Sequence, residues 1–158
     1  WQGLAERQPD PEFCTFRSMP WGYRAAFIVL RTYCHKYGLR TVRDIIARWA
    51  PPEDGNDTEN YARKVCALTG FPPDKCLNPY DPSHMAPLVA AMSRVECGVK
   101  PSMSQIKEGW SLYMGTTDRN SLTSKTSMPM NKTVWNTLLN VIIAVASAIL
   151  GAIGGSAM

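Results

Sequence analysis

Glu96 is the residue of this sequence whose position most clearly suggests chemistry. It lies in the segment 91–98 (AMSRVECG), and the apolar spacing places it in the last turn of a helix. At that end the helix dipole disfavours a negative charge, and apolar neighbours would favour the neutral carboxyl further. A carboxyl that is protonated near neutral pH can act as a general acid and protonate a glycosidic oxygen. Two plainer interpretations are a solvated surface glutamate and a glutamate paired with Arg94.

A second group of polar and aromatic side chains follows in one loop and the start of the next helix. Its members are Trp49, Glu53, Asp54, Asn56, Asp57, Thr58, Glu59 and Tyr61. Amide and hydroxyl groups can hydrogen-bond sugar hydroxyls, aromatic rings offer flat faces to sugar rings, and a carboxylate could assist Glu96. Composition alone favours a structural interpretation, in which prolines end a helix, a glycine makes a turn, and Asp57 or Thr58 caps the next helix.

The composition argues against several other classes of site and partner. The 158 residues carry a net charge of +4, and the basic residues are scattered, whereas a nucleic-acid-binding surface gathers them. The acidic loop 53–59 would also repel phosphate. Five cysteines occur without Cys-x-x-Cys spacing, and the two histidines lie in no metal-ligand pattern. We therefore expect no nucleic-acid partner, no metal site and no cofactor.

Apolar spacing predicts a mainly α-helical domain over residues 1–114. The expected helices cover 22–37, the stretch between a Thr41 cap and Pro51, the stretch between an Asp57 or Thr58 cap and Gly70, about 85–96, and a short segment after Ser102. The first twenty residues lack a helical period, so we expect them to form an extended segment or a hairpin.

The composition changes near residue 115, and the segments beyond it differ from the domain. Residues 115–129 are polar and rich in Ser and Thr, which indicates a linker. Residues 134–153 are uncharged and mostly apolar, and a helix of about 20 such residues can span a bilayer. The alternative is a buried core helix, but the linker separates this segment from any core. We therefore expect a hydrophobic transmembrane tail at 130–158.

Several motifs of the domain together resemble a family of phage and prophage lytic structural proteins. These motifs are Trp1-x-Gly3, Phe16-Arg-Ser18, Gly22-Tyr-Arg-Ala25, Trp49-Ala-Pro-Pro-x-x-x-Asn56-x-Thr58-x-x-Tyr61, Ala91-x-x-x-x-Glu96-x-Gly98 and Gly109-Trp-Ser-Leu-Tyr113. The family is similar to the muralytic protein of enveloped double-stranded RNA phages, which belongs to the lysozyme superfamily. The resemblance covers about residues 1–114 and implies a lysozyme-like helical domain.

Autolysin-type glucosaminidases provide a second resemblance. In those enzymes a helix ends in a catalytic Glu followed by Gly, and a Trp-x-Gly turn and a Tyr-Ala-x-Lys motif come later. Here 91–98 resembles the helix, 1–3 the turn and 61–64 the last motif, which implies a circularly permuted domain with Glu96 as general acid. The chain departs from the family in lacking an upstream Asn-Pro-x-Asn-Ile-Arg segment. The second catalytic group stays unassigned between Asp54, Asp57 and the substrate itself.

These resemblances imply cleavage of the glycan strands of peptidoglycan, by a lysozyme, a glucosaminidase or a lytic transglycosylase. Glu96 would protonate the leaving oxygen, and Trp49, Asn56, Thr58 and Tyr61 would line the saccharide groove. One alternative is a catalytically inactive phage structural protein that binds the cell wall. Another is a helical adaptor that binds a partner protein.

The tail has a resemblance of its own. From Met130 onward it is similar to the short hydrophobic smalltalk proteins of Bacteroidetes mobile elements, which are encoded beside cell-wall hydrolases. This resemblance implies a membrane anchor, with the domain in a phage virion or in the bacterial envelope facing the periplasm. The expected partners are peptidoglycan, the membrane and phage structural proteins.

Overall fold

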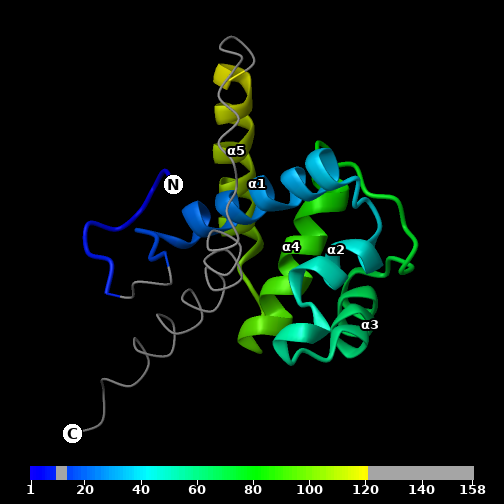
Figure 1. Ribbon diagram of the computed structural model, residues 1–158. Helices are drawn as coiled ribbons and strands as arrows, with labels where there is room; N and C mark the ends of the chain where they lie inside the picture. Colours follow the sequence, from blue (N-terminus) through cyan, green and yellow to red (C-terminus); the bar gives the residue numbers. More distant parts are fainter. Residues whose placement is uncertain (10–13, 121–158) are drawn as a thin grey trace, which may run out of the picture.

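The computed structural model describes residues 1–9 and 14–120, and for residues 116–120 it describes the backbone only. In chain order the elements are α1 (Met19–Tyr37), α2 (Val42–Trp49), the 3-10 helix η1 (Pro52–Asp54), α3 (Thr58–Thr69), α4 (Pro82–Cys97) and α5 (Met103–Asn120). Figure 1 shows α1 crossing α5, with α2, α3 and α4 gathered to one side. No strand occurs within these described ranges, so the expected mainly α-helical class is confirmed.

Short polar side chains begin the helices, as expected from the sequence. The Thr41 hydroxyl accepts a hydrogen bond from the Asp44 amide (3.1 Å), and the Asp57 carboxylate accepts one from the Asn60 amide (3.1 Å). The fourth helix begins at Pro82, about three residues earlier than expected. Its cap is Asp81, and a proline fits the first helical position because the amide there has no partner within the helix.

The core lies where α1 packs against α5 and where α4 contacts α1, α3 and α5. Its largest fully buried side chains include Phe27, Leu30, Tyr33, Ile45, Ile46, Trp49, Leu88, Met92, Ile106 and Tyr113. Gly109 permits the close crossing of α1 and α5, because a Cβ there would lie 2.7 Å from the Tyr23 Cβ and 2.8 Å from the Pro20 carbonyl oxygen. Burial of these apolar side chains holds the helices in place relative to one another, and so positions the helix ends that carry the candidate sites.

The segment before α1 is extended and doubles back on itself. Leu4 and Phe16 form an isolated antiparallel bridge, so the expectation of an extended segment or hairpin is confirmed. Gly3 has a φ of 76°, and the Trp21 ring lies where its Cβ would be, at 2.1 Å. Glycine is therefore required at this position by the backbone and by the ring.

The last helix is longer than the sequence indicated. α5 continues to Asn120, six residues into the expected linker 115–129, since no proline occurs between Pro101 and Pro129 to stop it. None of the helices in the described part of the chain is long and apolar enough to cross a membrane. The remainder of the linker and the whole expected tail at 130–158, including the transmembrane segment 134–153, lie outside the described residues.

Candidate functional site

Three helix ends meet around Glu96. Trp49 is the last residue of α2, Tyr61 lies in the first turn of α3, and Glu96 lies in the last turn of α4. The chain reverses between α2 and α3 through η1 and Gly55, whose φ of 79° favours glycine. This turn returns Tyr61 to the side of Trp49, and α3 packs on both α2 and α4 (Figure 1).

Glu96 accepts two hydrogen bonds on one carboxylate oxygen. The Tyr61 hydroxyl donates to Oε1 over 2.7 Å, and the Trp49 indole Nε1 donates to the same atom over 3.2 Å. Burial and the neighbouring Glu96 carboxylate raise the pKa of Tyr61 far above its ordinary value. The tyrosine therefore stays protonated and remains a donor at any physiological pH. We call Trp49, Tyr61 and Glu96 the Glu96 cluster.

The second carboxylate oxygen of Glu96 faces a different situation. Among the described residues, no donor hydrogen-bonds Oε2. Oε2 is also absent from the buried side-chain atoms that lack a partner in this part of the chain, so it is accessible to solvent. Arg94 is exposed and forms no ion pair with Glu96 within the described ranges. Glu96 is half-buried. Neither the ion-paired nor the fully solvated interpretation fits, and Oε2 is the atom that could meet a substrate.

The remaining residues expected in a saccharide groove stabilise the turn between α2 and α3. The Thr58 hydroxyl donates to the Ala50 carbonyl, and the Asn56 amide donates to the Pro51 carbonyl over 3.0 Å. Trp49 is 1% exposed, so its ring offers no face to a sugar and acts through its indole N–H instead. This corrects the expected stacking role of Trp49, since the aromatic ring that ends α2 is drawn into the core.

The two acidic candidates for a second catalytic group, Asp54 and Asp57, lie in η1 and at the start of α3. Asp57 is engaged in capping α3, and Asp54 lies exposed in η1. Neither residue hydrogen-bonds Glu96 in the described part of the chain.

Sequence reasoning missed a second layer of polar groups behind Glu96. The hydroxyls of Tyr23 and Ser93 lie 3.4 Å apart, and both residues are buried. Burial raises the pKa of the Cys97 thiol, while a hydrogen bond with Ser93 partly offsets this rise. The signal was the helical spacing of Ser93, three residues before Glu96 and four before Cys97. Within residues 1–9 and 14–120, no group of three His, Cys, Asp or Glu side chains could hold a metal ion.

Comparison with known proteins shows that the chain is similar to a phage protein. Protein P5 of Pseudoalteromonas phage PM2 is 43% identical over 116 residues, which are 72% of this chain and 70% of that protein. The chain belongs to the family of this phage protein. Its expected association with phages is thereby confirmed. Residues 130–158 match a different group, the Family of unknown function (DUF6486), and that match begins at Met130, where the hydrophobic tail was expected to begin.

Proposed function

We propose that this chain is a phage-associated glycosidase of the lysozyme-like type, which cleaves the glycan strands of peptidoglycan with Glu96 as general acid. The observation that carries the proposal is the pair of hydrogen bonds to Oε1 from Tyr61 and Trp49. These bonds come from two other helices, and they orient the carboxyl while Oε2 stays open to solvent. Such preorganisation of a single carboxyl is typical of a catalytic acid.

The proton transfer would proceed from Oε2. Protonated Glu96 gives its proton to the glycosidic oxygen as the bond between that oxygen and the anomeric carbon breaks, which leaves Glu96 as a carboxylate. Two neutral donors, the Tyr61 hydroxyl and the Trp49 indole, stabilise the negative charge as it develops on the carboxylate.

The second catalytic group would come from the substrate. Enzymes that use two carboxylates place them on both sides of the scissile bond. The Glu96 cluster has one carboxylate, Asp57 caps α3, and Asp54 lies exposed in η1. The N-acetyl or hydroxyl group of the sugar can then assist departure of the leaving group, which favours a lytic transglycosylase or a substrate-assisted hydrolase. The domain would act in the virion or at the envelope, with residues 130–158 as membrane anchor.

The proposal is tested with the full chain on purified peptidoglycan. The parent protein should release soluble muropeptides, and Glu96→Gln should release them at least about 100-fold more slowly, although Gln keeps an oxygen that accepts from Tyr61 and Trp49. Glu108→Gln is the matched control, because Glu108 is an exposed glutamate of α5. Mass spectrometry of the products separates an anhydro end, formed by a transglycosylase, from a reducing end, formed by a hydrolase. Equal release by parent and Glu96→Gln would exclude Glu96 as the acid.

A catalytically inactive wall-binding or partner-binding phage protein is the second candidate. It is favoured by one observation, that Trp49, Asn56 and Thr58 all use their polar atoms in contacts within the protein. In that case Glu96 would only tie α4 to α2 and α3. Co-sedimentation with peptidoglycan without release of muropeptides by the parent protein would support this candidate.

A further inference from the structure

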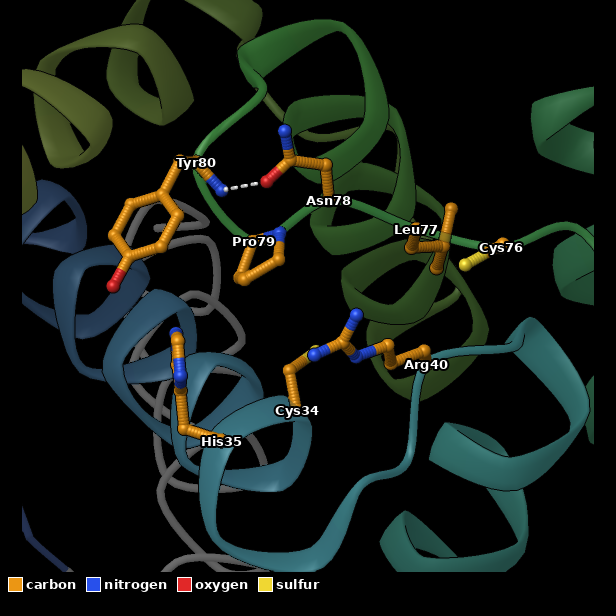
Figure 2. A pocket seen from close by; sticks show the side chains of 8 residues that line it. All are labelled: Cys34, His35, Arg40, Cys76, Leu77, Asn78, Pro79 and Tyr80. Atoms are coloured by element: carbon orange, nitrogen blue, oxygen red, sulfur yellow. Dashed lines mark hydrogen bonds between the residues drawn. The ribbon is translucent and has the colours of Figure 1, made fainter.

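A cavity of about 260 Å³ lies at the opposite end of α4 from Glu96, where the end of α1 meets the connector before α4. It is lined by Cys34, His35, Arg40, Cys76, Leu77, Asn78, Pro79 and Tyr80 (Figure 2). We call it the Arg40 pocket. Its volume lies just below the range of sites for drug-sized ligands, so a small molecule or the end of a chain would fill it.

The walls of the Arg40 pocket are held in place by hydrogen bonds from several elements. The Leu77 amide donates to the Arg40 carbonyl over 2.8 Å, next to an isolated bridge between Thr41 and Cys76. On the other wall the Tyr113 hydroxyl, from α5, donates to the Pro79 carbonyl over 3.2 Å. The pocket is thus built by contacts between segments far apart in the sequence, and it is formed before any ligand arrives.

Arg40 is the lining side chain that can only donate hydrogen bonds, and it is exposed to solvent. Figure 2 shows the Arg40 side chain reaching over Cys34, with His35 on one side and Pro79 above. No carboxylate in the described part of the chain pairs with Arg40, and no Asp or Glu lines the cavity. Burial raises the pKa of the Cys34 thiol, so this thiol adds no negative charge. The Asn78 side-chain oxygen is already used by the Tyr80 amide, 3.0 Å away.

The negative C-terminal end of the α1 dipole offsets only part of the positive charge of Arg40. A helix C-terminus carries the equivalent of about half a negative elementary charge. Arg40 carries a full positive charge, and Lys36 in the last turn of α1 adds another at the same end. The apolar part of the lining, Leu77, Pro79 and the exposed Tyr80 ring, offers surface to an uncharged body.

We propose that the Arg40 pocket binds the free carboxylate of a small molecule or of a peptide end, with Arg40 pairing with the carboxylate and Tyr80 and Pro79 covering the body. A planar guanidinium can donate two parallel hydrogen bonds to a carboxylate. Two sources carry this chemistry, the D-amino acid ends of cell-wall peptides and the L-amino acid ends of protein chains. This inference does not depend on glycan cleavage by Glu96.

The chain contains its own reporter of occupancy, because Cys76 lines the pocket and is exposed. The full chain is treated with iodoacetamide, and the alkylation rate at Cys76 is followed by peptide mass spectrometry, with the half-buried Cys14 as internal reference. The probes are N-acetyl-D-alanine, N-acetyl-L-alanine and their uncharged amides at matched ionic strength. At a probe concentration of about ten times Kd, alkylation of Cys76 should slow about tenfold, because only the empty pocket reacts.

Arg40→Gln should abolish the protection by either acid, whereas Arg43→Gln, which removes an exposed charge nearby, should retain it. The amides should not protect Cys76, and the difference between the D and L acids identifies the source. A rise in melting temperature with the acids, lost in Arg40→Gln, is the second readout. The proposal is overturned if acid and amide protect equally, if neither acid protects Cys76 or raises the melting temperature, or if Arg40→Gln keeps the protection.

Discussion

The two ends of α4 each carry a carboxylate that accepts two hydrogen bonds, and the two carboxylates differ in where the donors come from. Asp81 precedes the first turn and Glu96 lies in the last turn, about 22 Å away at 1.5 Å per residue. Asp81 Oδ1 accepts from the amide and the hydroxyl of Ser83, two residues away. Glu96 Oε1 accepts from Tyr61 and Trp49, 35 and 47 residues away.

The local contacts of Asp81 are explained by the helix that it begins. A carboxylate is favoured at a helix N-terminus, and hydrogen bonds with Ser83 lower the pKa of Asp81. Glu96 lies at the end where the dipole disfavours its charge, and the helix gains no cap from it. The fold nevertheless directs two buried or half-buried donors to it. The helix does not explain the contacts of Glu96, whereas it does explain those of Asp81, and this difference supports Glu96 as the candidate functional carboxyl.

The difference between Glu96 and Asp81 predicts that only Glu96 is needed for cleavage. Glu96→Gln should lower peptidoglycan cleavage by about 100- to 10,000-fold, the usual contribution of a general acid. Asp81→Asn should leave cleavage unchanged, since Asn caps a helix nearly as well as Asp. Initial rates of muropeptide release by both variants make the measurement, with circular dichroism to show that each variant is folded. Comparable losses in the two variants would contradict the distinction.

The donors to Glu96 can be tested one at a time. Tyr61→Phe removes the hydroxyl and keeps the ring, so kcat/KM should fall about 10- to 100-fold, as expected for one hydrogen bond to a developing charge. Tyr23→Phe is the matched control, because its hydroxyl contacts Ser93 rather than Glu96. Steady-state rates on peptidoglycan separate the two variants. An equal loss in both would mean that packing, and not the hydrogen bond to Glu96, sets the rate.

The packing of α1 against α5 stabilises the Arg40 pocket. Cys34 and His35 on α1 line the pocket, and Tyr113 on α5 hydrogen-bonds the Pro79 carbonyl in its wall. Gly109→Ala should lower the free energy of unfolding by about 1–3 kcal/mol, because a Cβ there would meet Tyr23 and Pro20. Gly115→Ala, on the same helix, meets no atom within 4 Å and should stabilise the protein by up to about 1 kcal/mol. Urea denaturation of both variants checks the opposite signs. Equal effects would show that the crossing tolerates a side chain.

Local rules of sequence predicted the helices and the place of Glu96, but not the environment of the sites. The Thr41 cap and the glycines after three helices act within a few residues of themselves, so their effects could be read directly. The burial of Trp49 follows from helical spacing, which places it on one inner face of α2 with Val42, Ile45 and Ile46. Its hydrogen bond to Glu96 depends on where α2 and α4 lie relative to each other, which spacing within α2 does not determine. The Arg40 pocket joins 34–40 to 76–80, and no pattern within either segment indicates that they meet.

The smallest expected effect concerns Asp81, whose contacts stabilise the start of α4. The pKa of Asp81 in the folded protein lies below its ordinary value of 3.8, with the Ser83 side chain as the main cause. The group therefore stabilises the fold above about pH 3.8, and this stabilisation is lost as pH falls through the lower folded-state pKa. The electrostatic interaction with His84, whose Nδ1 lies 4.0 Å from Asp81 Oδ2, lowers the pKa of Asp81 further.

Asp81→Ala should accordingly melt below the parent at pH 7, and the difference should shrink as the pH falls below 3.8. Glu108→Ala removes an exposed carboxylate of α5 that caps no helix and should show no such convergence. Melting temperatures measured between pH 7 and pH 2.5 make the comparison. A difference that persists at the lowest pH would show that Asp81 acts through its shape and not through its charge. In that case, Asp81 and Glu96 would differ only in whether their hydrogen-bond donors are local or distant in the sequence, and not in the role of their charge.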